Sequence, residues 1–408
     1  MTFEPLIQSV VSISIPIVFY CLPVLLFVAA WKLLRYYTRA KYLGETEFVL
    51  LEIKIPKTLM KTPQAMELAL NALHQGWDGD NFYKIWFLGQ ARAWSSLELV
   101  SIGGEVHFYI WAQKFFKNLI EAQFYAQYPE IEIHEVEDYV HNVPYDLPGS
   151  DWKLWGAEFK LSKADAYPIK TYVNYGLDKI SSDSESDAWR TDPITAVLEY
   201  LGSMKPGEQL WIQIPVQAAK DRFHKPGTWW GKQGWKDEGK ALIEKIMQRD
   251  KKGGEDESLG LTILSPGERK VVEDIERSLA KPGFDCGLRA LYLAKPELYH
   301  PNRVVSTLGI FKQYNAADSN GFKTAFTTSD KYPWSAFWRG YSLAKFKAVF
   351  FNNYRQRAFF YPPYVGAQFT LSAEELATIY HFPGSAAMTP TLGKIESKRA
   401  EPPANLPI

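Results

Sequence analysis

The longest apolar run of the chain lies near its N-terminus, at Leu6–Leu34, and no charged residue stands between Glu4 and Lys32. A helix needs about 20 apolar residues to cross a hydrocarbon core of about 30 Å, and this run exceeds that length. The remainder of the chain is too polar and too irregular to cross a second time. The pattern therefore predicts one transmembrane helix, residues 6–34, within an N-terminal region of residues 1–44.

Basic residues follow this run directly, whereas the short N-terminal flank carries only Glu4 and the free amine; the basic residues are Lys32, Arg35, Arg39 and Lys41. Positive charge stays on the cytoplasmic side of a spanning helix. The flank predicts a single-pass protein of the cell (inner) membrane, with its N-terminus outside and its body in the cytoplasm. The alternative is a cleaved signal peptide, which has a basic start and a short apolar region. The acidic start and the long run favour the anchor.

Residues 45–141 read as a first domain with the element order β-α-β-β-α-β. The two central strands meet at the Gly103-Gly104 pair, which is a hairpin signal. Gln75–Arg92, with its glycines and aromatic residues, is expected to be a loop. The order is that of the ferredoxin-like split unit, a fold that indicates no function by itself. The expected strands and helices are Glu47–Ile55, a helix from Pro63, Trp94–Ile102, Glu105–Ala112, Lys114–Gln127 and Glu130–Val136.

Residues 142–330 are expected to form a second α+β domain, so the fold class is α+β throughout. Prolines and a glycine cluster in Asn142–Asp151 and mark the boundary. Strands are predicted at Lys153–Leu161 and Ile169–Tyr175. Further helices and strands alternate after them, including a helix that a capping box opens at Ser265.

No acidic residue occurs between Asp330 and Glu374, where basic residues interleave with aromatic ones. This pattern suits the phosphates of single-stranded nucleic acid or of anionic lipids. The alternative is that the aromatic residues form core and the cations a solvated face. The aromatic and basic segment spans 331–383 and ends in a short helix that a capping box opens at Ser372; a Pro-rich linker or tail, 384–408, follows. The candidate anion-binding residues are Arg339, Lys345, Lys347, Arg355 and Arg357.

The search for catalytic chemistry yields no constellation of residues. The Gly227–Lys232 stretch has three residues between its glycines and Gln233 after its lysine, so it is not a P-loop. The seven histidines show no metal-binding spacing. Cys286 is expected to be a buried small hydrophobe within a strand. Because 46 Lys and Arg balance 46 Asp and Glu, net charge indicates no partner. We expect no enzyme activity, no cofactor and no metal.

Several phrases together resemble the N-terminal, non-catalytic region of bacterial membrane-anchored ATPases related to conjugative type IV secretion and to the FtsK/HerA DNA translocases. In such proteins a linker like the Pro-rich tail leads into a nucleotide-binding domain with a P-loop, which this chain, stopping at Ile408, lacks. The phrases lie at Leu51–Leu73, Leu119–Pro129, Asp192–Gln213, Ser265–Gly283 and Glu375–Ile408.

The resemblance implies a membrane-anchored accessory or docking module of a type IV secretion or DNA-translocation ATPase system, without the ATPase domain itself. Its implied partners are the lipid bilayer and a P-loop ATPase in cis or in trans, with nucleic acid and further copies of the chain as additional candidates. The alternative is an independent membrane-associated protein that binds nucleic acid or lipid through Lys331–Tyr361. A P-loop domain encoded directly after Ile408, or next to it, would favour the first function.

Overall fold

The computed structural model describes residues 4–56, 59, 61–76, 82–145, 150–178, 191–221, 223–224, 231–248, 264–329 and 343–384. The chain forms two compact units. The first combines Met1–Glu47 with Trp77–Ala93, and the second combines Phe48–Gly76 with Trp94–Ile408.

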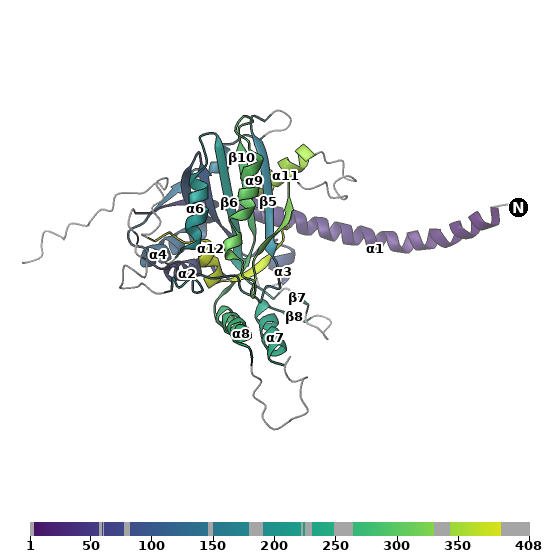
Figure 1. The fold of residues 1–408 in the computed structure, drawn as a ribbon. Helices are drawn as coiled ribbons and strands as arrows, with labels where there is room; N and C mark the ends of the chain where they lie inside the picture. Colours follow the sequence, from purple (N-terminus) through teal and green to yellow (C-terminus); the bar gives the residue numbers. More distant parts are fainter. Residues whose placement is uncertain are drawn as a thin grey trace, which may run out of the picture. The chain divides into compact units, whose positions relative to one another are not determined.

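The first unit is built on one long helix, α1 (Glu4–Glu45), which contains the whole predicted apolar run (Figure 1). Its part from Phe19 to Glu45 is long and apolar enough to cross a membrane, and none of that apolar stretch is buried within the protein. The expectation of an N-terminal helix that could span a membrane is therefore confirmed. The second helix of this unit, α3 (Phe82–Trp86), lies within Gln75–Arg92, which we predicted to be a loop.

The second unit is organised by a ten-stranded antiparallel sheet with the order β11-β5-β10-β6-β2-β3-β1-β4, and β9 and β12 branch from β6. Sequence order and spatial order differ because β6 returns to pair with β2. The strands are β1 (Phe48–Lys54), β2 (Ser95–Ile102), β3 (Glu105–Gln113), β4 (Glu132–Val136), β5 (Lys153–Leu161), β6 (Glu208–Ala218), β9 (Gly283–Cys286), β10 (Leu288–Ala294), β11 (Phe322–Thr327) and β12 (Phe369–Ser372).

One face of the sheet carries the apolar core. Side chains alternate between faces along a strand, and Leu97, Leu99, Ile212 and Ile214 all join the same buried apolar cluster. The helices packed into this cluster are α2 (Pro63–Leu70), α4 (Lys117–Gln127), α6 (Pro193–Gly202), α9 (Pro301–Gly309) and α12 (Ala373–Ile379).

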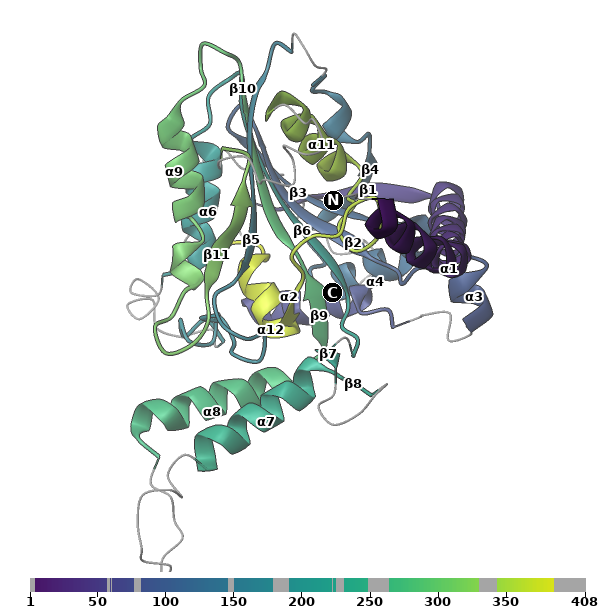
Figure 2. The same cartoon turned by 90° about the vertical axis from the view of Figure 1, so that its right-hand side faces the viewer.

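The opposite face is more polar and is covered by residues 343–366, which we call the covering segment. It begins with α11 (Leu343–Arg355), which lies on the other side of the sheet from α6 and α9 (Figure 2). Phe350 of α11 packs so closely on Gly156 of β5 that a Cβ on that glycine would lie 2.2 Å from the ring. The intervening strand residues Glu98, Gln213 and Arg289 are fully buried beneath it.

A helical hairpin, α7 (Trp235–Gln248) and α8 (Pro266–Leu279), extends from the sheet (Figure 2). The two helices pack closely, because a Cβ on Gly239 of α7 would lie 2.6 Å from Leu279 of α8. The predicted capping box of α8 is confirmed: the Ser265 side chain accepts from the Glu268 backbone, and the Glu268 side chain accepts from Ser265 in return. A two-stranded ribbon, β7 (Phe223–His224) and β8 (Lys232–Gln233), precedes the hairpin.

Two predictions about organisation are wrong. The boundary at 142 does not separate two compact units, because β2 of the predicted first domain pairs along its whole length with β6 of the second. The predicted strand Ile169–Tyr175 is instead a series of turns. Its backbone donates to side chains of the α12 region, since Ile169 N–H donates to Glu375 and Tyr172 N–H to Thr378. The α+β class itself is confirmed.

Candidate functional site

The predicted basic flank lies on the C-terminal third of α1. Lys32 and Lys41 are exposed, and Lys41 lies 4.0 Å from Glu45 on the next turn. Arg35 and Arg39 are half-buried, and the Arg35 guanidinium sits over the Trp86 ring of α3 at 4.0 Å from its centroid. The flank therefore combines exposed lysines with half-buried arginines, of which Arg35 contacts Trp86 within the first unit.

The predicted anion-binding residues do not form one surface. Lys345 is exposed and Lys347 is half-buried on α11, whereas Arg339 lies outside the described residues. Burial, together with the positive charge of Lys153 on β5, lowers the pKa of Lys347. Arg355 donates to His141 Nδ1 at 3.0 Å. These three described cations remain candidates for anion binding.

Arg357 corrects the surface prediction, because its side chain is only 1 % exposed. Its Nε and Nη2 donate to the two carboxylate oxygens of Glu98, each at 3.0 Å. Its Nη1 and Nη2 also donate to Asp138. Tyr354, an aromatic residue of the same segment, is fully buried as well. The physical reason is that an arginine with two carboxylates loses little by burial when its fork geometry is satisfied.

The Glu98 carboxylate is the centre of a buried polar cluster on the covered face of the sheet. Besides Arg357 it accepts from Ser96 Oγ at 2.7 Å, from Gln213 Nε2 at 2.6 Å and from Tyr139 Oη at 2.8 Å. Although burial by itself would lower it, the negative charge of Glu98 holds the pKa of Arg357 well above its usual value. Burial and the same charge raise the pKa of Tyr139. The Glu98 carboxylate thus accepts hydrogen bonds from four side chains, and its negative charge keeps Arg357 protonated.

A second buried arginine joins the sheet to the end of α11. Arg289 of β10 donates from Nε to Gln213 at 2.6 Å, from Nη2 to the Asn353 carbonyl at 3.1 Å, and from Nη1 to the Ala358 carbonyl at 3.1 Å. A cation at the C-terminal end of a helix satisfies carbonyls that have no partner within the helix. Burial lowers the pKa of Arg289. Its position explains how the covering segment is fastened to the sheet.

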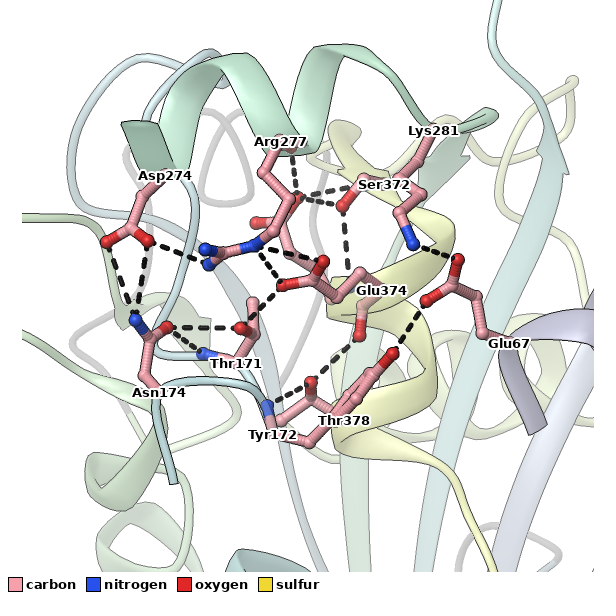
Figure 3. A network of polar contacts seen from close by, with 12 residues as sticks. Glu67, Thr171, Tyr172, Asn174, Asp274, Arg277, Lys281, Ser372, Glu374 and Thr378 are labelled. Atoms are coloured by element: carbon pink, nitrogen blue, oxygen red, sulfur yellow. Dashed lines mark hydrogen bonds and ion pairs between the residues drawn. The ribbon is translucent and has the colours of Figure 1, made fainter. Parts of the chain in front are cut away.

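A second polar network surrounds the start of α12 (Figure 3). Glu374 accepts from Arg277 Nε of α8 at 3.1 Å and from Thr171 Oγ1 at 2.7 Å. Alongside, Glu67 of α2 accepts from Lys281 at 2.6 Å and from Tyr172 Oη at 2.8 Å. The network therefore ties α12 to α2, to the helical hairpin and to the turns after residue 168.

Glu375 lies beside this network and is fully buried. It accepts from the backbone N–H groups of Ile169 and Ser372, and from the hydroxyls of Ser372 and Ser278. Burial raises its pKa to about 7, although the backbone donor of Ser372 acts in the opposite direction. The predicted capping box of this helix, Ser372 with Glu375, is confirmed.

Cys286 and His381, two further side chains with possible chemistry, are buried and hydrogen-bonded within the protein. Cys286 is fully buried, and its thiol donates to the Phe284 carbonyl. His381 is buried against Asp192, with 3.0 Å between Nε2 and Oδ1. Within the described ranges, no group of three His, Cys, Asp or Glu residues is placed to hold a metal ion. Lys232 is exposed on β8, and residues 227–230 of the Gly227–Lys232 stretch lie outside the described residues.

Sequence reasoning missed Glu98 and Arg289, the two central charges of the covered face. The available signal was a charged residue in the middle of an otherwise apolar strand, as in Ser95–Ile102 and Leu288–Ala294. Such charges are rarely buried unless they are paired. The pairing partners lie 259 and 76 positions away, Arg357 for Glu98 and Gln213 for Arg289, so only the fold brings them together.

The comparisons with known proteins identify a family without indicating an activity. No curated protein matches the chain. The description of the matching family names no function, so the resemblance to membrane-anchored secretion ATPases stays a prediction. The match begins at residue 51, after α1, and continues beyond α12 to residue 394. Because it covers most of the chain, the protein belongs to the family described as Domain of unknown function (DUF8128).

Proposed function

We propose that this protein is a membrane-anchored, non-catalytic docking module that serves a P-loop ATPase of the type IV secretion or DNA-translocation kind, supplied in cis or in trans. The observation that carries the proposal is α1, whose apolar stretch is not buried in the protein. An exposed apolar helix of this length finds its natural solvent in a bilayer. The resemblance of the body to the non-catalytic region of such ATPases supplies the partner class.

The orientation follows from the basic flank. Lys32, Arg35 and Arg39 follow the apolar run, which favours a cytoplasmic body and an outer N-terminus in the cell membrane. Cysteine variants at Thr2 and at the exposed Lys245 test this with a membrane-impermeant thiol reagent applied to intact cells. We expect labelling at Thr2 alone before lysis and at Lys245 after lysis. Labelling at Lys245 in intact cells would reverse the orientation.

The arrangement of the body suits a rigid scaffold more than a catalyst. Its carboxylates are used in contacts that hold elements together. Glu98 ties the covering segment to the sheet through Arg357, whereas Glu67–Lys281 and Glu374–Arg277 join α2 and α12 to the helical hairpin and its end. The strand order β2-β3-β1-β4 with the helices α2 and α4 supports a ferredoxin-like unit at one end of the sheet. We infer that the body presents docking surfaces rather than a reaction site.

Site-specific photo-cross-linking in cells tests the docking role. A photoreactive residue is placed at each of three exposed apolar positions on different helices: Leu119, Met247 and Val305. The matched control is the fully buried Leu97, which should yield no intermolecular adduct. We expect covalent adducts with a P-loop ATPase from at least one exposed position. If none of the three exposed positions forms an adduct with a P-loop ATPase, the docking proposal is overturned.

A second candidate function, binding of anionic lipid or nucleic acid, is favoured by one observation. Burial, together with the positive charge of Lys153, lowers the pKa of Lys347, so two cations lie near each other on α11 and β5. Such a pair is relieved by an anion. The variant K345E/K347E should then weaken binding of the full chain to anionic vesicles or to single strands, and wild-type binding should fall as salt rises. Binding that is insensitive to salt and to the substitutions would remove this candidate.

A further inference from the structure

The helix α3 attaches to α1 at the end of the apolar run through aromatic contacts. The Trp86 ring stacks on Trp31 with 5.4 Å between centroids, and Phe87 meets the same Trp31 edge-on at 5.9 Å. The guanidinium of Arg35, one turn further along α1, also lies over the Trp86 ring, 4.0 Å from its centroid. These contacts fix α3 at a defined level along α1.

The backbone after α3 also lies directly on α1. Gly89 has a φ of +68° and a Cβ placed on it would lie 2.3 Å from the backbone carbonyl carbon of Thr38. Only a glycine allows both the left-handed conformation and this close approach. The segment 82–89 is therefore clamped to α1 at two levels, near Trp31 and near Thr38.

The level of Trp31 sets the depth of the segment in a membrane. Trp31 lies three residues before Leu34, the end of the apolar run, which corresponds to about 4.5 Å along the helix axis. If the run occupies the hydrocarbon, the Trp31 ring lies at the boundary between acyl chains and headgroups. Phe87, in contact with that ring, must lie at the same depth.

Several exposed side chains of the segment 82–89 are of the kind that favours this boundary. Tyr83 is 57 % exposed, Phe87 42 % and Leu88 52 %, and the rings of Tyr83 and Phe87 stack on each other at 5.5 Å. On α1, Tyr36 and Tyr37 are also exposed at the next level. Aromatic rings with one polar edge concentrate at membrane interfaces, and apolar side chains beside them gain by leaving water.

We propose that the segment 82–89 is a second membrane contact, which lies in the headgroup layer of the leaflet that faces the body and inserts Phe87 and Leu88 among the upper acyl chains. The inference rests on the proposed membrane anchoring through α1. The occupant of this apolar surface is the lipid bilayer, because the surface is continuous with the helix that the bilayer surrounds. The segment fixes how deeply α1 sits and prevents it from sliding along the membrane normal.

Spin labels on single cysteines test the depth in the full chain, reconstituted in phosphatidylcholine nanodiscs. The background variant is Cys21→Ala, since Cys286 is fully buried and does not compete for the label. The test position is Leu88, with Tyr83 as a second position on the same segment. The control for lipid is Leu25 of α1, which is 64 % exposed in the structure, and the control for water is Lys245 of α7. Collision with oxygen, which concentrates in lipid, is compared with collision with a water-soluble nickel complex.

We expect the oxygen-to-nickel ratio at Leu88 to exceed that at Lys245 several-fold and to approach that at Leu25. A lipid-like ratio at Leu25 combined with a water-like ratio at Leu88 overturns the second contact and leaves the anchor intact. A water-like ratio at Leu25 overturns the anchor and with it the second contact. If Leu88→Cys cannot be reconstituted, the oxygen-to-nickel ratio at Tyr83 is compared with those at Leu25 and Lys245 and decides the question in the same way. The choice of a lipid without net charge ensures that attraction of Arg35 or Lys84 to anionic headgroups does not produce the result.

Discussion

The buried pair between Glu98 and Arg357 should be the most sensitive point of the covered face. The substitution Arg357→Met keeps an apolar stem in place and removes the guanidinium. Residue 357 has a φ of +48°, in the left-handed region. The cost of this backbone conformation is the same with either side chain. The change therefore isolates the charge from the unusual backbone conformation.

The expected cost follows from what remains after the substitution. Glu98 is fully buried and would keep only neutral donors, from Ser96, Gln213 and Tyr139. Removing one partner of a buried ion pair leaves an uncompensated charge and costs about 3–5 kcal/mol. That is a large share of the stability of a typical domain, about 5–15 kcal/mol. We expect Arg357→Met to lower the free energy of unfolding by about 3–5 kcal/mol.

Urea unfolding of the full chain in a mild non-ionic detergent, followed by tryptophan fluorescence, measures this cost by linear extrapolation. The matched control is Arg355→Met, two residues away, where the arginine is half-buried and donates to His141. Losing that partly exposed contact should cost at most about 1 kcal/mol. The double variant Glu98→Gln with Arg357→Met should be more stable than Arg357→Met alone, because no buried charge is left unpaired.

Two results would refute this reasoning. The first is a cost for Arg357→Met no larger than that for Arg355→Met, which would mean that the covering segment is not fastened through this pair. The second is a double variant less stable than the single one, which would mean that the remaining carboxylate is well accommodated by its neutral donors. A double-mutant cycle over the two positions separates the pair from its surroundings.

Three further predictions concern other sites. Burial raises the pKa of Glu375 to about 7 from a usual 4.5, so between these pH values the native state holds a proton that the unfolded chain has released. The free energy of unfolding should therefore fall by about 3 kcal/mol as pH rises through this window. Urea titrations of Glu375→Gln should show a flatter dependence on pH. Gly156→Ala should cost about 1–3 kcal/mol in the same assay, because its Cβ would meet Phe350, whereas Gly309→Ala, with nothing within 4 Å, should not; equal costs would contradict the close packing of α11. The purified chain should release no phosphate from ATP, and Lys232→Ala should not alter this result. ATP turnover that disappears with this substitution would show that the Gly227–Lys232 stretch binds nucleotide.

The sequence by itself determined the features that depend on short-range chemistry. The apolar run predicted α1, because spanning length and absence of charge are local properties. The capping boxes at Ser265 and Ser372 predicted where α8 and α12 begin, since a cap involves residues three apart. The hairpin of β2 and β3 followed from the Gly103-Gly104 turn. The prediction that Cys286 is buried was also correct, and it rested on the apolar residues Leu288 and Ala290 close by in the sequence.

Only the tertiary structure decided which of the charged and aromatic residues are interior. The interleaved cations and rings after residue 330 have the same local pattern whether they face water or the sheet. Arg357 is buried because Glu98 and Asp138, more than 200 positions earlier, meet its guanidinium, and Tyr354 is buried with it. The pairing of β2 with β6 joins two predicted domains into one sheet, and it too depends on contacts between distant strands. The periodicity of a sequence indicates which face of a helix or strand is apolar. Which segment covers the opposite, more polar face depends on packing and on ion pairs between residues far apart in the sequence.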